Sequence, residues 1–212
     1  MGKTERVAVI VCARSTSTRL PNKGMTDVGG MSAIEKVLLA CRHADVGPVV
    51  AAVPTGDPLA LYIRKCGIAL VVEGDENNVL DRFWHAAVAS NCDTFVRITA
   101  DCVLMWPELI RWVVQEHLEN GNDFTTVCRE PRRVPDGLDV ECISMRMLTK
   151  MSCIQDKELC EHVTLDIYRR WDEYSKEYKI DNIDYPLPMG EKYSIDTGED
   201  LERIRAHVAA TR

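Results

Sequence analysis

Residues 7–44 read VAVIVCARSTSTRLPNKGMTDVGGMSAIEKVLLACRHA and contain the first structural unit of the chain. The short apolar run at 7–13 predicts a buried strand. The segment 32–44 predicts a helix, because Ser32 and Glu35 match a capping box ahead of apolar residues at helical spacing. A buried strand followed by an amphipathic helix is the unit from which mostly parallel sheets are built.

The same alternation of short apolar runs and longer amphipathic runs continues through most of the chain, which predicts an α/β fold. The rhythm breaks at 129–160, where we expect an insertion, and 212 residues suit a single domain. The expected strands are 7–13, 48–53, 68–72, 94–98, 123–128, 179–183 and 192–195. The expected helices are 32–44, 57–66, 79–90, 107–118, 158–171 and 197–210.

The composition is that of an ordinary globular protein: 46% of residues are hydrophobic and 28% are charged. It excludes disordered, collagen-like and coiled-coil classes. The apolar runs are shorter than the roughly 18–20 residues that span a bilayer, so we expect no membrane partner. Nine cysteines without a C-x-x-C pair predict free, mostly buried thiols and a cytoplasmic protein.

The net charge of -7 argues against a nucleic-acid partner, yet residues 1–25 hold five basic residues and one acidic residue. Within this segment, the loop that follows the first strand carries Arg14, Arg19 and Lys23 among hydroxyl side chains. Ligands of open α/β sheets bind at this edge, and such cations suit a triphosphate. Neither G-x-x-x-x-G-K-[ST] nor G-x-G-x-x-G occurs. A solvated basic loop is an equal alternative.

Two acids, Asp101 and Asp196, are each expected just after a strand. Magnesium takes one or two carboxylates and completes its shell with water and substrate phosphates, so the pair predicts a Mg²⁺ site. A helix N-cap is the alternative role for Asp196, because Thr-Gly-Glu-Asp follows it.

A third pattern is Pro-Asp-Gly at 135–137, a turn signal that precedes Asp139 and Glu141 on one face of a predicted strand. The alternative is a hairpin with a solvated face. Glu161 and His162 lie on a predicted helix, where a lone histidine is more often a surface residue than a ligand.

Six motif blocks share one order along the chain. They are A-R-x-x-S-x-R-L-P-x-K at 13–23, G-x-x-x-x-V-L-D-R-[FY] at 74–83, R-[IV]-T-x-D-C at 97–102, P-D-G-L-D-V-E at 135–141, E-H-V-T at 161–164 and D-T-x-E-D-L at 196–201. In this order they resemble the cytidylyltransferases that activate acidic sugars (acylneuraminate and 3-deoxy-manno-octulosonate cytidylyltransferase-like), in the branch around spore-coat polysaccharide biosynthesis protein F.

The resemblance implies a three-layer α/β/α sandwich of the nucleotide-diphospho-sugar transferase type, GT-A-like and Rossmann-like without the glycine fingerprint. It implies a single nucleotidyltransferase domain over 1–212 that joins CTP to an anionic small-molecule acceptor, a nonulosonic or keto-sugar acid. The products would be a CMP-activated sugar and pyrophosphate, with Mg²⁺ as cofactor. A homodimer is the family habit, and 129–160 is the expected dimerisation segment.

The resemblance also implies roles for particular residues. Catalysis falls to Arg14, Lys23, Asp101 and Asp196, and the last two would hold the metal. The nucleotide-binding set is Ala13, Arg14, Ser15, Ser17, Arg19, Lys23, Asp75, Asp81, Arg82, Thr99 and Asp101. The acceptor-binding set is Arg97, Asp139, Glu141, Glu161 and His162. Two positions depart from the family pattern: Val103 replaces a usual proline, and Cys12 replaces a common glutamine.

Two other functions stay open. Related cytidylyltransferases act on phosphonates, which would use additional cations such as Arg129, Arg132 and Arg133. A nucleotide-sugar-dependent glycosyltransferase would normally carry an Asp-x-Asp motif, whereas this sequence has only Asp-x-x-Asp spacings.

Overall fold

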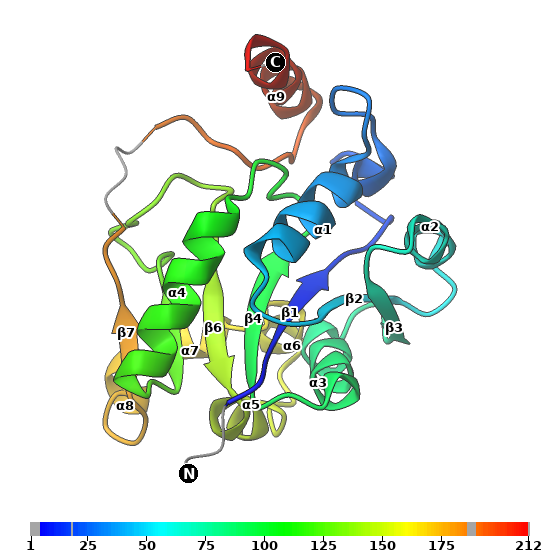
Figure 1. The fold of residues 1–212 in the computed structure, drawn as a ribbon. Coiled ribbons are helices and arrows are strands. Elements are labelled where there is room, and N and C mark those ends of the chain that lie inside the picture. The colour runs from blue at the N-terminus through cyan, green and yellow to red at the C-terminus, as the bar shows by residue number, and fades with distance from the viewer. Residues whose placement is uncertain (1–4, 18, 186–189, 212) are drawn as a thin grey trace.

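The computed structural model describes residues 5–17, 19–185 and 190–211. Within these residues, the strands form one seven-stranded sheet of order β3-β2-β1-β4-β6-β5-β7 (Figure 1). The strands are β1 (Val7–Cys12), β2 (Val49–Pro54), β3 (Leu70–Gly74), β4 (Thr94–Thr99), β5 (Phe124–Thr126), β6 (Glu141–Ser144) and β7 (Ile180–Asn182). The pairs among β1 to β4 are parallel, and β6 is antiparallel to both β4 and β5.

Helices cover both faces of the sheet, so the expected three-layer α/β/α sandwich is confirmed (Figure 1). Alternate residues of β1 point to opposite faces: Val9 belongs to the hydrophobic cluster on one face of the sheet, and Ile10 belongs to the cluster on the other. The helices are α1 (Ala33–Ala44), α2 (Pro58–Cys66), α3 (Val79–Ser90), α4 (Pro107–Asn120), α5 (Met145–Met151), α6 (Lys157–Glu161), α7 (Leu165–Arg169), α8 (Trp171–Tyr174) and α9 (Gly198–Ala210).

The strand order reverses at β1, which pairs in parallel with β2 on one side and β4 on the other. Cys12 is in register with Thr99, so the loops after β1 and β4 leave the sheet side by side. Such a switch point opens a crevice at the carboxyl ends of the strands. The basic loop and Asp101 therefore start from adjacent positions.

Capping boxes mark the start of two helices, α1 (Ala33–Ala44) and α9 (Gly198–Ala210). Ser32 and Glu35 form the expected capping box of α1. Thr197 and Asp200 form a second one at α9. The N-cap of α9 is therefore Thr197, and the alternative interpretation of Asp196 as the cap is wrong.

The structure differs from the expectations in three places. The segment 129–160 supplies β6, which lies inside the sheet between β4 and β5, so it is more than an insertion. The expected helix at 158–171 is broken into α6, α7 and α8, because His162 and Thr164 leave helical geometry and the Thr164 hydroxyl hydrogen-bonds to Glu141.

The expected strand at 192–195 is an irregular segment instead. Its backbone bonds go to two loops rather than to a strand: the amide of Tyr193 donates to Asp136 O and that of Ile195 donates to Asp101 O. The segment therefore serves as a tether across the carboxyl edge of the sheet.

All nine cysteines are unpaired, and Cys153 alone is exposed, as the sequence predicts for free and mostly buried thiols. Among the described residues, no helix combines the length and the apolar character needed to cross a bilayer.

Candidate active site

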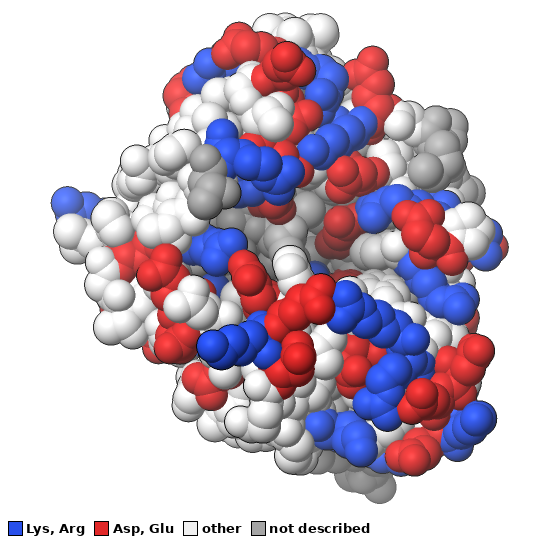
Figure 2. Space-filling model, turned by 180° about the vertical axis from the view of Figure 1, so that it is seen from behind, with Lys and Arg blue, Asp and Glu red and all other residues white. Residues whose placement is uncertain are grey.

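Two cavities adjoin each other at the carboxyl edge of the sheet. The first, about 290 Å³, lies over β1 and β4, and the second, about 490 Å³, lies between β6 and the helices α6 and α7. Arg97, Thr99 and His162 line both. Figure 2 shows a hollow, rimmed by basic and acidic side chains, on the face turned away in Figure 1. After the roles that the resemblance implies for their lining residues, we call the two spaces the nucleotide cavity and the acceptor cavity.

The three cations of the basic loop, Arg14, Arg19 and Lys23, all line the nucleotide cavity. Asp57 anchors this loop, because its Oδ2 accepts the amide of Ser15 at 2.8 Å while its Oδ1 caps α2 through the amide of Leu59. The sequence pattern identifies Asp57 only as the start of a helix.

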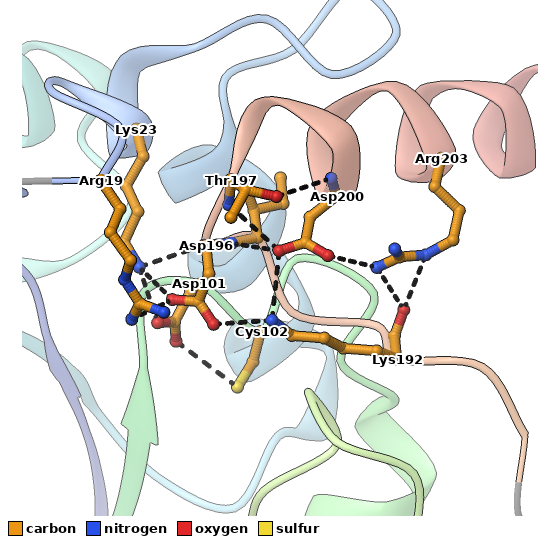
Figure 3. Close-up of polar contacts among 10 residues, drawn as sticks. Arg19, Lys23, Asp101, Cys102, Lys192, Asp196, Thr197, Asp200 and Arg203 are labelled. Carbon is orange, nitrogen blue, oxygen red and sulfur yellow. Dashed lines mark hydrogen bonds and ion pairs between the residues drawn. The ribbon is translucent and has the colours of Figure 1, made fainter.

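Lys23 joins the two predicted metal ligands (Figure 3). Its Nζ lies 2.8 Å from Asp101 Oδ2 and 3.5 Å from Asp196 Oδ1. The backbone bond from Ile195 N to Asp101 O, 3.1 Å long, draws the two acidic loops together. Burial raises the pKa of Asp101, but the Lys23 ammonium outweighs it and leaves the pKa below its ordinary value. The Asp101 carboxylate is therefore charged at neutral pH.

A second layer of charges holds Asp196 in place (Figure 3). Lys192 Nζ lies 2.7 Å from Asp196 Oδ2, and Asp200 accepts the backbone amides of Asp196 and Thr197 at 3.0 Å. Burial opposes the charge on Asp200, yet the amide of Asp196 and the cations Lys192 and Arg203 hold its pKa far below the ordinary range. Lys192 and Asp200 are absent from the predicted site, although Asp200 belongs to the motif block at 196–201 and to the capping box of α9.

The Pro-Asp-Gly turn supports the same region. The amide of Tyr193 donates to Asp136 O at 2.6 Å, and a Cβ on Gly137 would lie 2.2 Å from the backbone nitrogen of Ser194. Gly137 also has a φ of +96°. Only glycine fits such a close approach in this conformation. The turn thus fixes the segment that carries Asp196.

The donor chemistry of this corner fits a Mg²⁺ ion. Asp101 and Asp196 supply two carboxylates beside the cations expected to bind phosphates. No group of three or more His, Cys, Asp or Glu side chains poised for a metal occurs in the part of the chain that the structure describes. Two carboxylates suit an ion that draws its other ligands from water and substrate.

In the acceptor cavity, Glu141 is the centre of a buried hydrogen-bond network. Its Oε2 pairs with Arg97, and its Oε1 accepts hydrogen bonds from Thr164 and Tyr168. Glu141 is only 3% exposed. Burial and the Glu141 charge raise the pKa of Tyr168, so its hydroxyl stays protonated. Because its oxygens are occupied, Glu141 braces Arg97 and is poorly placed to bind a sugar hydroxyl.

Two further ion pairs line the acceptor cavity: Arg132 with Asp139, and Arg169 with Glu158. Burial raises the pKa of Asp139, while Arg132 opposes that effect. Thr164, Tyr168 and Arg169 are absent from the predicted site. Thr164 and Tyr168 are four residues apart, a spacing that places two side chains on one face of a helix, whereas no such spacing points to Arg169.

Other predicted residues divide between the cavity and its surroundings. Ala13, Ser17, Arg82, Thr99 and Glu161 line the nucleotide cavity, and Glu161 pairs there with Arg14 at 3.1 Å. The structure thus places Glu161 beside the nucleotide cavity, whereas the acceptor side was expected.

Three members of the nucleotide-binding set lie outside this lining. Ser15, a residue of the basic loop, is buried. Asp75 is exposed and accepts the amides of Asn77 and Asn78, and Asp81 lines a separate cavity beside Trp84.

The surroundings of Cys12 and Val103 explain how the site accommodates these two departures from the family pattern. Cys12 lines the nucleotide cavity, and burial raises its pKa, so it offers a neutral thiol. Val103 N donates to Asp101 O at 2.9 Å, a bond that proline could not form. Valine therefore supports the turn that aims Asp101.

A cation-lined cavity at the switch point of a mostly parallel sheet is the place where open α/β proteins bind their ligands. A family model described as "Cytidylyltransferase" matches residues 8–207. The chain therefore belongs to the cytidylyltransferase family and is a nucleotidyltransferase.

Relatives and solved structures agree with this assignment. Spore coat polysaccharide biosynthesis protein SpsF of Bacillus subtilis (strain 168) is 30% identical over 210 residues, covering 94% of this chain and 85% of that protein. The 3-deoxy-manno-octulosonate cytidylyltransferase of Xanthobacter autotrophicus is 32% identical over 132 residues. That alignment covers 60% of this chain and 51% of the relative.

A cytidylyltransferase structure from Leptospira borgpetersenii serovar Hardjo-bovis superposes with a TM-score of 0.88 at 25% identity, covering 98% of this chain and 88% of that one. CMP:2-keto-3-deoxy-manno-octonic acid synthetase, solved in complex with CTP, gives a TM-score of 0.72 at 16% identity. The coverage is 98% of this chain and 100% of that one, which supports the fold.

Proposed function

We propose that this protein is a CTP-dependent cytidylyltransferase that forms a CMP-activated acidic sugar, a nonulosonic or keto-sugar acid, and releases pyrophosphate. The observation that carries the proposal is the pair of cavities that meet at Arg97, Thr99 and His162. One holds the cations and carboxylates that a triphosphate requires, and the other has room for a second substrate. Their junction is where the acceptor oxygen would approach the α-phosphate.

The residues of the nucleotide cavity act by position and charge. Arg14, Arg19 and Lys23 neutralise the departing pyrophosphate as the bond between the α-phosphorus and its bridging oxygen breaks. Asp101 and Asp196 would hold Mg²⁺, which when bound supplies positive charge beside the α-phosphate. Lys23 pairs with both acids, so the phosphate-binding and metal-binding groups form one charge-balanced cluster.

The size and chemistry of the acceptor cavity favour a sugar acid over a small phosphonate. Its volume is about 490 Å³, larger than that of the nucleotide cavity. Its arginines are already paired, Arg97 with Glu141, Arg132 with Asp139 and Arg169 with Glu158. Polar groups such as those of Thr164 and His162 suit several hydroxyls. Cytidylyltransferases transfer a nucleotide group, so the glycosyltransferase alternative is dropped.

Thermal unfolding with magnesium and each of CTP, UTP, ATP and GTP tests the donor. Ligand binding to the native state raises the unfolding midpoint, and we expect this with CTP only. A rise with UTP alone, or with none of the four, would overturn the proposal. Pyrophosphate release with sugar acids and with small phosphonates then identifies the acceptor. Turnover of phosphonates alone would contradict the sugar acid and assign a phosphonate as the acceptor.

We propose further that the protein works as a homodimer in the cytoplasm. The unpaired cysteines suit a reducing compartment, and the family resemblance supports the dimer. Residues of 129–160 outside β6 are the proposed contact. Light scattering of the purified protein tests the assembly, and a monomeric mass at micromolar concentration contradicts it.

A further inference from the structure

We propose that Glu161 sets the affinity of the nucleotide cavity for polyphosphates by occupying, on Arg14, the place of a phosphate group. Any polyphosphate that reaches Arg14 must then displace the Glu161 carboxylate. The inference rests on the proposed function, because it takes Arg14 as a phosphate-binding residue.

The contact joins two distant parts of the chain inside the cavity. Glu161 Oε1 at the end of α6 lies 3.1 Å from Arg14 Nη2 in the loop after β1, and both side chains line the nucleotide cavity. A carboxylate oxygen and a phosphate oxygen both accept a charge-assisted hydrogen bond from a guanidinium. The free protein therefore keeps Arg14 paired with an internal anion.

Glu161 differs from the other acids of the cavity in its attachment. Asp101 and Asp196 each contact more than one neighbour, including Lys23, and backbone bonds hold their loops. Glu161 makes no ion pair other than that with Arg14 among the described residues. The two side chains are 39% and 43% exposed, so either can turn toward water. Glu161 is thus the acid of this cavity that a ligand can replace at low cost.

The strength of the ion pair between Arg14 and Glu161 limits how much Glu161 can change the affinity for a polyphosphate. A half-exposed ion pair contributes at most about 1 kcal/mol, which corresponds to about five-fold in a dissociation constant. A triphosphate carries several negative charges and outcompetes a single carboxylate. Pyrophosphate loses the same contact when Glu161 returns to Arg14, so the residue also favours release of this product.

Calorimetric titration of the magnesium-containing protein with CTP, inorganic pyrophosphate and cytidine tests the proposal. In Glu161→Gln we expect CTP and pyrophosphate to bind about two- to five-fold more tightly than in wild type. Cytidine, which has no phosphate, keeps its affinity. Unchanged or weaker binding of CTP and pyrophosphate in this variant would overturn the inference.

Glu158→Gln is the matched control. Glu158 lies on the same helix and pairs with Arg169 in the acceptor cavity at 2.7 Å, so its loss removes a comparable half-exposed ion pair that does not involve Arg14. We expect CTP and pyrophosphate affinities to stay at the wild-type value, and tightening equal to that of Glu161→Gln would also overturn the inference. Absence of CTP binding in wild type contradicts the proposed function itself, a separate outcome.

Discussion

At the scale of single residues, the carboxylates of the two cavities have different tasks. Asp101 keeps its charge through Lys23 and faces the nucleotide cavity. Glu141 is enclosed by Arg97, Thr164 and Tyr168. Both are acids that follow or begin a strand, and both belong to motif blocks. Asp101 is therefore open to a ligand, whereas Glu141 supports the side chains that line the acceptor cavity.

Replacement of Asp101 by asparagine removes the charge but keeps the shape. We expect kcat for nucleotidyl transfer to fall by about two to three orders of magnitude, because a group that balances transition-state charge is lost. The unfolding midpoint should change little. Steady-state assays of pyrophosphate release measure this, and near-normal turnover contradicts the metal-ligand role. Asp172→Asn, which changes an exposed acid outside both cavities, is the control.

Replacement of Glu141 by glutamine should affect stability first. The change leaves the buried Arg97 guanidinium without its counter-charge, which costs about 3 kcal/mol or more in the free energy of unfolding. His162→Ala, at an exposed residue that lines both cavities, should lower turnover and leave stability within about 0.5 kcal/mol. Urea unfolding compares the two variants. If Glu141→Gln lowers the free energy of unfolding no more than His162→Ala does, the Glu141 network does not stabilise the fold.

At the scale of elements, the Pro-Asp-Gly turn at 135–137 acts on a segment nearly sixty residues further along the chain. Its Gly137 makes room for the backbone of Tyr193 and Ser194, and Asp196 follows directly. A solvated hairpin turn would make no such contact. The turn is therefore a structural support of the active site, although it contributes no side chain to the chemistry.

Gly137→Ala should displace the segment that carries Asp196, because the new Cβ would lie 2.2 Å from Ser194 N. We expect a loss of at least tenfold in turnover together with lower stability. Gly67→Ala is the matched control: Gly67 also has a positive φ, +64°, but a Cβ there meets nothing within 4 Å. Only backbone strain of about 1 kcal/mol should follow in the control. Equal activity in both variants contradicts the supporting role.

Elements with local signals could be predicted from the sequence, and elements defined by distant partners could not. Capping boxes and apolar spacing predict α1 and α9, and the segment 79–90 matches α3 to the residue. The break at His162 and Thr164 escapes prediction, because it depends on a hydrogen bond to Glu141 from another strand. The same holds for 192–195, whose partners are loops.

At the scale of the whole molecule, a buried histidine links folding to pH. His117 on α4 is 1% exposed, and its Nδ1 lies 3.0 Å from Thr125 Oγ1 on β5. Burial lowers its pKa from 6.5 to about 4, although Asp123 opposes the shift. The folded protein thus excludes a proton that the unfolded chain accepts below pH 6.5.

Stability should therefore be complete above pH 6.5 and fall as the pH decreases toward about 4, by up to about 3 kcal/mol. Urea unfolding at pH 7 and pH 5 measures the difference. His117→Gln should reduce this pH dependence, and His43→Gln, at an exposed histidine, should leave it intact. An unchanged slope in His117→Gln would assign the pH dependence to other groups.

The composition of the site could be predicted better than its layout. The cations of the loop and the acids after the strands follow from the position of strand ends, which a parallel sheet brings to one edge. The partners of those residues could not be predicted. Lys192 and Asp57 reach the site through packing of loops, and Glu161 faces Arg14 because α6 ends beside the nucleotide cavity.

The sheet order also constrains how the protein can assemble during synthesis. β5 leaves the ribosome before β6, yet β6 lies between β4 and β5. A nascent chain that ends before residue 141 can complete the four parallel strands, but it has no neighbour for Phe124–Thr126. The three residues of β5 would therefore stay unpaired until β6 is synthesised and pairs with β4. A chain that terminates between β5 and β6 would thus expose an unpaired strand edge, which is prone to aggregation and is the kind of surface that chaperones recognise.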